Sequence, residues 1–286
     1  MKLATLRLAG RTAAARIEVG DGVAVEVSAS DVGALLRQPD WAQIAAGAAG
    51  PRHPLGTVDY APLVPRPEKI LCVGQNYRAH IAEQGVEAPK YPTLFAKFSS
   101  ALTGAYDDID LPAASAACDW EVELAVIVGA PAWRVSIDNA MDAVAGYAVL
   151  NDLSMRDWQY RTSQFLQGKT FDRCTPLGPW LVTRDDGDID ERSLDLSCEL
   201  NGEQVQRGSS SDLLFDVAHL VSYISGFSAL SPGDVIATGT PGGSGHWRQP
   251  SRYLQDGDVL VTRIAGLGEC RNVCRRENEV EGNVNR

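Results

Sequence analysis

The chain has 286 residues and a mass of 30.7 kDa, with 44% hydrophobic and 22% charged residues. This composition excludes a largely disordered chain, a collagen and a long coiled coil. Acidic residues outnumber basic ones, 37 to 26, and the net charge of −11 argues against a nucleic-acid binder. No apolar run reaches the roughly 18 residues that a membrane span needs, and Arg7 and Arg11 interrupt any signal-peptide core. We therefore expect a cytoplasmic protein without membrane or nucleic-acid partners, whose six cysteines are free, buried thiols.

Residues 1–66 are expected to form a small N-terminal α/β domain. An Ala-rich stretch over residues 34–49 predicts a helix, with Asp31 as its N-cap. Short apolar runs separated by glycine-containing turns predict three strands, at residues 3–8, 14–19 and 23–27. A string of prolines then predicts a linker, because proline neither continues a helix nor fits a central strand: Pro51, Pro54, Pro62, Pro65 and Pro67.

The remainder of the chain, residues 67–277, predicts a β-rich α+β domain that ends in a polar tail, 278–286. Apolar residues recur at helical spacing over 213–224, and Asn201-Gly202 is typical of a type I′ hairpin turn. The predicted strands are residues 70–73, 122–128, 143–150, 194–200, 203–206, 235–237 and 259–261.

Two glutamates at the start of a buried strand are the first candidate site residues. Side chains alternate along a strand, so Glu121 and Glu123 lie on one face, roughly 6–7 Å apart at the backbone. Two carboxylates in that position repel each other and are costly to desolvate, unless a hard divalent cation such as Mg²⁺ or Mn²⁺ binds them. The alternative is a solvated strand end with both glutamates on its polar face.

A third acid, Asp152, ends another apolar strand and could converge with the glutamates on one ion. Three carboxylates would leave up to three positions open in an octahedral shell, which suits binding of a substrate. Apart from Cys118, no histidine or cysteine lies near these acids in sequence, which disfavours zinc. The alternative for Asp152 is the N-cap of a following helix.

Hydrogen-bond donors follow this acid in the sequence, and a histidine precedes the cluster. Arg156, Gln159 and Lys169 could reach the acids, although Arg156 could instead pair with Asp157 or Asp152. His80 and Glu83 are neighbours on one helical face, where the carboxylate would orient the imidazole for water activation, unless they are an ordinary surface pair. The loop 238–245 could hold a carboxylate on its backbone N–H groups or be a mobile turn. His53 and His219 are expected to be structural, and His246 stays open.

Taken in order, these motifs closely resemble the fumarylacetoacetate hydrolase family. The resemblance covers about residues 69–277 and fits the shorter bacterial branch of acylpyruvases and 2-hydroxyhepta-2,4-diene-1,7-dioate isomerases. Residues 71–74 lack the extra acidic ligand of the eukaryotic enzyme. The motifs that carry the resemblance are Gly74-Gln75-Asn76-Tyr77, His80 with Glu83, Glu121-Val122-Glu123, Asp152 with Arg156 and Gln159, Lys169, and Thr238-Gly239-Thr240-Pro241.

The resemblance implies a mixed β-sandwich roll and a homodimer. It also implies Mg²⁺ or Mn²⁺ as cofactor, with Ca²⁺ as an occupant in crystals, held by Glu121, Glu123 and Asp152. It implies catalytic roles for His80, Glu83 and Lys169, with His80 and Glu83 on a mobile segment. The substrate-binding set is then Tyr77, Arg156, Gln159, Gly239 and Thr240.

The activity that this resemblance implies is hydrolysis of a carbon–carbon bond in a β-diketo acid of the acylpyruvate or fumarylpyruvate type. Its products are pyruvate and an acid. The first alternative is decarboxylation of oxaloacetate or isomerisation of a 2-hydroxy-diene-dioate, which share the enolate chemistry. A non-catalytic keto-acid binder ranks below both. Residues 244–248 depart from the family's usual pattern and leave the acyl group open.

Overall fold

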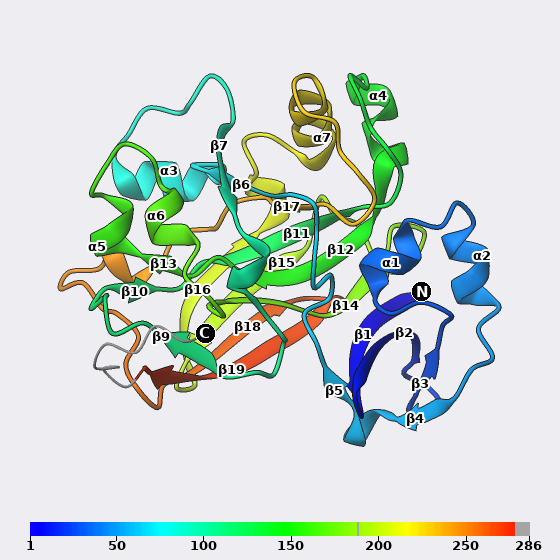
Figure 1. Cartoon of the computed structure of the whole chain (residues 1–286). Helices are drawn as coiled ribbons and strands as arrows, with labels where there is room; N and C mark the ends of the chain where they lie inside the picture. The colour runs from blue at the N-terminus through cyan, green and yellow to red at the C-terminus, as the bar shows by residue number, and fades with distance from the viewer. Residues whose placement is uncertain (188, 278–286) are drawn as a thin grey trace.

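The computed structural model describes residues 1–187 and 189–277, and it has the predicted β-rich α+β architecture. A large mixed sheet runs through the molecule and packs against a smaller, five-stranded sheet (Figure 1). The large sheet has the order β4 (Arg52–Pro54), β3 (Val23–Glu26), β2 (Arg11–Glu18), β1 (Lys2–Leu8), β14 (Thr175–Thr183), β12 (Val144–Asn151), β11 (Val122–Val128), β17 (Val235–Ala237), β6 (Ile70–Gly74) and β7 (Thr93–Lys97), with β5 (Asp59–Tyr60) beside β1 and β8 (Leu102–Thr103) beside β14.

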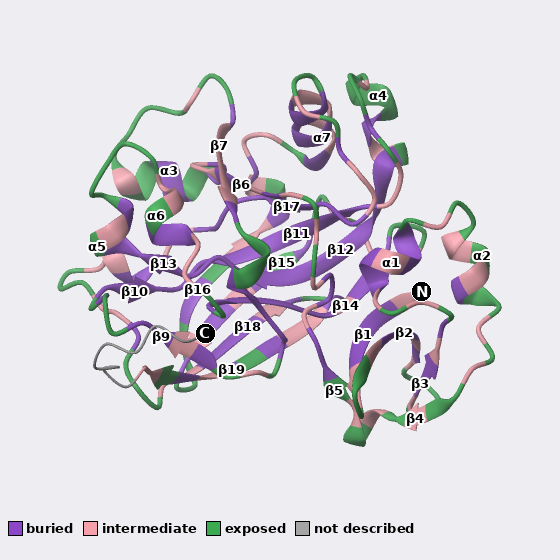
Figure 2. Cartoon of the chain, viewed as in Figure 1, coloured by how far each residue is buried: buried purple, intermediate pink, exposed green. Residues whose placement is uncertain are grey.

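The smaller sheet covers one face of the central strands. It has the order β16 (Glu203–Ser209), β15 (Asp195–Leu200), β18 (Val259–Ile264), β19 (Gly268–Arg276) and β9 (Ile109–Leu111), and a separate pair joins β10 (Cys118–Asp119) to β13 (Ser154–Met155). Leu124 and Val126 of β11 pack with residues of β15 and β18, whereas Ala125 and Ile127 pack on the opposite face. Strand β11 is therefore buried on both sides, as its apolar run predicts (Figure 2).

Short helices cap the ends of the sheets. They are α1 (Val32–Leu36), α2 (Trp41–Ala46), α3 (Arg78–Gln84), α4 (Ile137–Ala140), α5 (Arg156–Gln159), α6 (Leu166–Lys169) and α7 (Val217–Ser225), with 3₁₀ turns η1 (Leu55–Thr57), η2 (Ser99–Ala101), η3 (Met141–Ala143), η4 (Ser210–Asp212) and η5 (Gly245–Trp247). The single helix predicted over 34–49 is wrong, because Pro39 lacks an N–H and interrupts it between α1 and α2. Asp31 is the N-cap of α1, as predicted.

The N-terminal segment joins the large sheet directly. Strand β1 pairs with β14 in the register Lys2↔Val182, and its other neighbours are β2 and β5. The proline-rich stretch predicted to be a linker contains β4 and β5, and Pro54 lies on an edge strand, where its missing N–H costs no ladder bond. The division into domains stays a prediction, and the polar tail 278–286 lies outside the described residues.

Two local predictions are confirmed. Asn201 and Gly202 connect β15 to β16 with positive φ angles of 54° and 82°, the backbone that a type I′ turn requires. All six cysteines are free and buried. Among the described residues no helix combines the length and apolar character needed to cross a bilayer.

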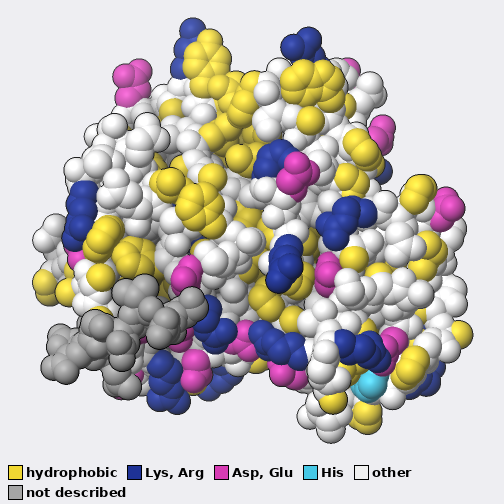
Figure 3. All heavy atoms as spheres, viewed as in Figure 1, with side chains coloured by type: hydrophobic (Ala, Val, Ile, Leu, Met, Phe, Trp, Pro, Cys, Tyr) yellow, Lys and Arg dark blue, Asp and Glu magenta, His cyan; other side chains and the backbone are white. Residues whose placement is uncertain are grey.

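The surface carries apolar side chains near the ends of two helices. In Figure 3 they gather over the α7 and α4 end of the molecule, where Trp133, Ile137 and Phe227 are among the exposed large residues. Charged groups of both signs are interspersed over the rest of that face (Figure 3). The predicted homodimer stays a prediction.

Close packing of β12 on β14 gives a stability prediction. A Cβ added at Gly146 would lie 2.0 Å from the carbonyl oxygen of Val182 in the neighbouring strand. We expect Gly146→Ala to lower the free energy of unfolding by at least about 1–3 kcal/mol, measured by urea denaturation. Gly56→Ala is the control, because a Cβ there meets no atom within 4 Å. Equal stability of the two variants would contradict this packing.

Candidate functional site

The three predicted acids converge at the end of the central strands. Strands β11 and β12 are antiparallel with Val122 opposite Asn151, so Glu121 and Asp152 lie at the same end of the pair. Both side chains are buried, as is that of Glu123. Ligand oxygens of these three residues lie within 4.8 Å of one another. Of the alternatives, a solvated strand end and a helix N-cap at Asp152 are both excluded, since α5 has Met155 as its N-cap residue.

Two buried lysines bind this acid cluster. The Nζ of Lys169 donates to Oε2 of Glu121 at 2.5 Å and to Oδ2 of Asp152 at 2.7 Å, as its position in the sequence predicts. Lys97, at the end of β7, donates to Oδ1 of Asp152 at 2.6 Å and to the carbonyl of Leu153. Burial alone lowers the pKa of each ammonium, but the Asp152 carboxylate outweighs it and raises both above their ordinary value. Both lysines are therefore charged at neutral pH.

Arg156 forms a second buried ion-pair group. Its Nη2 donates to Glu121 at 2.6 Å and its Nε to Asp119 at 2.9 Å, while Nη1 donates to Gln159. The alternative pairing of Arg156 with Asp157 or Asp152 is therefore wrong. Asp119 also accepts the backbone N–H groups of Gly245 and His246, so one carboxylate ties the arginine to η5.

The charges of this cluster do not balance. Four buried carboxylates face three buried cations, which leaves one negative charge in excess. Burial, together with the charges of Asp152 and Glu121, raises the pKa of Glu123 well above its ordinary value of 4.5. Burial would do the same at Glu121, but Arg156 and Lys169 outweigh it and lower the pKa of that residue. The uncompensated carboxylate is therefore Glu123, whose Oε2 accepts the N–H of Gly239 at 2.8 Å.

This donor set fits a hard divalent cation. It is all oxygen, the oxygens are close together, and each carboxylate oxygen that already accepts a hydrogen bond has a second lone pair for a metal. A divalent cation would remove the excess negative charge and leave a net positive site, which suits an anionic substrate. Glu121, Glu123 and Asp152 would hold it.

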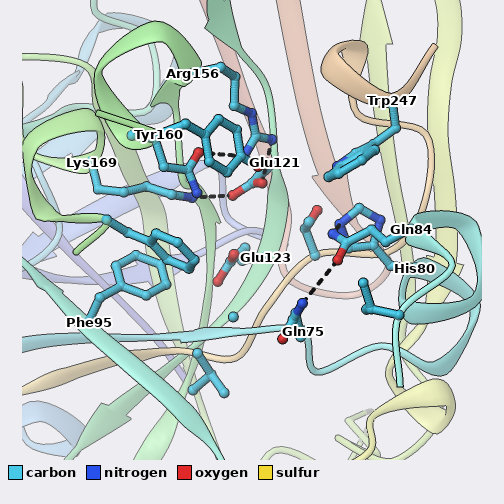
Figure 4. Close-up of a pocket in the computed structure, with 16 residues that line it drawn as sticks. Gln75, His80, Gln84, Phe95, Glu121, Glu123, Arg156, Tyr160, Lys169 and Trp247 are labelled. Carbon is cyan, nitrogen blue, oxygen red and sulfur yellow. Dashed lines mark hydrogen bonds and ion pairs between the residues drawn. The ribbon is translucent and has the colours of Figure 1, made fainter. Parts of the chain in front are cut away.

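The predicted His80–Glu83 pair lies on α3, across the cavity from the acids. The Nδ1 of His80 lies 2.8 Å from Oε2 of Glu83, and Glu83 also accepts the N–H of Gly243. The His80 side chain is 4% exposed and that of Glu83 is 32% exposed, so the pair is not an ordinary surface pair. Figure 4 shows His80 and Gln84 on one side of the cavity and Lys169 and Glu121 on the other.

The cavity between them measures about 180 Å³. This volume lies below the roughly 300–1,000 Å³ of sites for drug-sized ligands and suits a molecule of a few heavy atoms. Of the predicted site residues it is lined by His80, Glu121, Glu123, Arg156, Gln159, Lys169 and Thr240, and its other walls are Val73, Gly74, Gln75, Gln84, Val86, Phe95, Tyr160, Phe165 and Trp247.

Two predicted substrate-binding residues lie outside this lining. Tyr77 is fully buried in the hydrophobic core, and Gly239 faces Glu123 through its backbone N–H. The side chain of Thr240 accepts a hydrogen bond from Gln206, and its backbone belongs to the predicted loop.

Sequence reasoning gave no role to Lys97, Asp119, Gln75 or Gln84, although Gln75 lies within a motif that carries the family resemblance. Lys97 is a lone cation in an otherwise apolar strand, which is a usable signal, because such a residue needs a buried partner. Asp119 continues the alternation of Glu121 and Glu123 by one step, so it belongs to the same pattern. The two glutamines have no such signal, because their significance depends on what they contact in space.

The comparison with known proteins decides the family. Residues 69–275 match the fumarylacetoacetate (FAA) hydrolase C-terminal family. The chain belongs to this family. The predicted resemblance and the predicted fold class are thereby confirmed, including the bacterial branch.

Relatives of this FAA hydrolase family member have several activities in their names. The chain is 44% identical over 220 residues to the human mitochondrial oxaloacetate tautomerase FAHD2A, covering 76% of this chain and 70% of the relative. It superposes on fumarylacetoacetate hydrolase from Exiguobacterium antarcticum with a TM-score of 0.85 and 33% identity, covering 97% and 100%. For the 5-carboxymethyl-2-hydroxymuconate delta-isomerase of Mycobacterium smegmatis the TM-score is 0.81, with 33% identity and coverage of 98% and 100%.

Proposed function

We propose that this chain is a divalent-metal-dependent enzyme that moves a proton beside the oxo group of a small 2-oxo acid, with keto–enol tautomerisation of oxaloacetate as the leading reaction. The observation that carries the proposal is the placement of His80 opposite the acid cluster across one small cavity. The similarity to an oxaloacetate tautomerase and to a delta-isomerase supports the same class, because both reactions relocate a proton and break no carbon–carbon bond.

The two sides of the cavity would have different roles, substrate binding on one side and proton transfer on the other. Lys169, Arg156 and Gln159 present donors on one side, where they would bind the carboxylate and oxo oxygens of the substrate. His80, oriented by Glu83 through Nδ1, would take and return the carbon-bound proton through Nε2. When bound, a divalent cation supplies Lewis-acid polarisation of the oxo group. The aromatic side chains of Phe95, Phe165, Tyr160 and Trp247 line the remaining space and would limit the access of water to a bound substrate.

Hydrolysis of an acylpyruvate is the second candidate. The observation that favours it is the same imidazole–carboxylate pair, because it could deprotonate a water molecule that attacks the distal carbonyl. Hydrolysis consumes one water molecule per turnover and converts an acylpyruvate to pyruvate and a carboxylic acid. Decarboxylation of oxaloacetate, in contrast, would give pyruvate and carbon dioxide.

Metal removal tests the leading proposal. We expect chelation with EDTA to lower the catalysed decay of enol-oxaloacetate more than about 100-fold, and Mg²⁺ or Mn²⁺ to restore it. The decay is followed by ultraviolet absorbance, with buffer containing metal alone as the control for uncatalysed enolisation. Unchanged turnover after complete metal removal would contradict the metal dependence.

The products separate the candidates. Tautomerisation consumes enol-oxaloacetate without forming pyruvate, decarboxylation forms pyruvate from oxaloacetate, and hydrolysis forms pyruvate from acetylpyruvate or fumarylpyruvate. The same metal-loaded protein is given each substrate in turn, and pyruvate is measured with a coupled dehydrogenase. Rapid pyruvate release from acetylpyruvate, with no acceleration of oxaloacetate tautomerisation, would favour hydrolysis instead.

A further inference from the structure

A line of hydrogen bonds runs along the wall of the cavity and ends on the imidazole of His80. The Nε2 of Gln75 donates to Oε1 of Gln84 at 3.2 Å, and the Nε2 of Gln84 lies 2.7 Å from Nε2 of His80 (Figure 4). On its other side, Nδ1 of His80 lies 2.8 Å from Glu83. Both imidazole nitrogens are thus engaged by side chains of the protein.

The chemistry of these groups sets the direction of each bond. An ionised carboxylate only accepts, so Nδ1 of His80 carries the hydrogen that Glu83 receives. The Nε2 atom of the neutral ring then has a lone pair, and the amide NH₂ of Gln84 donates to it. The amide oxygen of Gln84 in turn receives the donor of Gln75, so all four side chains are matched in one arrangement.

This arrangement occupies the atom that the proposed reaction needs. A base accepts a proton through its lone pair, and here the lone pair of Nε2 is already used by Gln84. We propose that Gln84 is a positioning residue: it holds Nε2 of His80 while the cavity contains no substrate, and it releases this nitrogen when a 2-oxo acid enters. Only the use of Nε2 as the base rests on the proposed function.

The local backbone supports release at this point of the chain. Gln84 is the last residue of α3, and the C-cap Gly85 has a left-handed backbone with φ of 66°. Gln75 also has a positive φ, 55°, which is uncommon for a residue with a side chain, and it directly follows β6. Gln75 and Gln84 both line the cavity, so an entering substrate would meet this line of hydrogen bonds and displace the Gln84 amide from Nε2 of His80.

Chemical labelling of the full-length protein without substrate tests this directly. Diethyl pyrocarbonate acylates an unprotonated imidazole nitrogen, and peptide mass spectrometry reports the rate at each of the four histidines. Gln84→Met keeps the length of the side chain and removes its donor. We expect it to raise the labelling rate of His80 about tenfold, the effect of freeing one hydrogen-bonded lone pair. His53, His219 and His246 are internal controls whose rates should not change.

Two further measurements keep the test decisive. Gln43→Met, an exposed substitution on α2, should leave every rate unchanged. Nitrogen-15 chemical shifts of the unsubstituted protein should show His80 with its hydrogen on Nδ1, a result that does not depend on how a variant folds. A hydrogen on Nε2 of the neutral ring, or an unchanged labelling rate of His80 in Gln84→Met, would overturn the assignment.

Turnover separates this inference from the proposed function. Loss of the Gln84 donor should lower KM several-fold with kcat within about twofold, because substrate no longer displaces a hydrogen bond. If the protein turns over no 2-oxo acid, the proposed function fails, whereas the labelling rates and the nitrogen shifts still decide the role of Gln84. A raised KM with a lowered kcat would contradict a role in release.

Discussion

Glu123→Gln is expected to reduce the metal-dependent activity by more than about 100-fold, because even outer partners of metal ligands cost up to that factor when they are removed. Glu123 is the acid of the cluster without a cationic partner among the described residues, and its ligand oxygen lies within 4.8 Å of those of Glu121 and Asp152. A neutral amide at that position supplies one oxygen but no charge. Metal titration by calorimetry measures the loss of metal affinity, and the turnover assay measures the loss of activity.

Although it lowers activity, the same substitution is expected to raise the stability of the metal-free protein at neutral pH. The pKa of Glu123 is raised above 4.5 by burial and by the neighbouring carboxylates. A group whose pKa is higher in the folded chain stabilises that state fully below its unfolded value, and this contribution disappears as pH rises through the folded pKa. The chelated protein should therefore lose stability as pH increases above about 4.5, and Glu123→Gln should lose less.

Thermal unfolding across this pH range measures the difference. Added Mn²⁺ should raise the Tm of the unsubstituted protein. At a free Mn²⁺ concentration of a hundred times Kd, the gain in free energy of unfolding should be about 2.7 kcal/mol. The Tm of Glu123→Gln should not change. Glu87→Gln, at an exposed position, is the matched control. Equal metal stabilisation of all three proteins would refute a role of Glu123 in metal binding.

Lys97→Met is expected to lower the free energy of unfolding by about 3–5 kcal/mol in metal-free protein. The Lys97 side chain is fully buried and its ammonium lies 2.6 Å from Asp152, so its removal leaves a buried charge with less compensation. Methionine fills nearly the same volume, which separates loss of charge from loss of packing. Urea denaturation measures the change.

Divalent metal should partly rescue this variant. A cation bound at Glu121, Glu123 and Asp152 would compensate the carboxylate that Lys97 no longer neutralises. Lys90→Met, at an exposed position, should change stability by no more than about 0.5 kcal/mol. If Lys97→Met were as stable as the parent without metal, the charge balance described for this cluster would be wrong.

The sequence was most informative where one local pattern carried the structure. The apolar run after Glu123 predicted a strand covered on both faces. The Asn201-Gly202 pair predicted the hairpin turn between β15 and β16. The spacing of His80 and Glu83 likewise predicted their contact, because three residues along a helix return to the same face. The predicted helix over 34–49 failed because Pro39 outweighed the alanine content around it.

The exact partners in most contacts between distant segments could not be foreseen in this way. Arg156 has an adjacent aspartate in the sequence, yet it pairs with Asp119 and Glu121 from neighbouring strands. Lys97 and Asp152 are 55 positions apart in the sequence. The pairing of β1 with β14, which joins the N-terminal segment to the large sheet, connects residues still farther apart in the sequence. Such pairings depend on which strands lie side by side.

By itself, the sequence determined the strands, the acids at their ends, the imidazole–carboxylate pair and the family. Only the tertiary structure decided which cations neutralise which acids, which carboxylate lacks a partner, and that two glutamines lead to Nε2 of His80. The physical reason is that these two kinds of interaction act over different ranges along the chain. Backbone periodicity acts over a few residues, whereas the energy of a buried charge depends on every group within several ångströms, whatever its position in the chain.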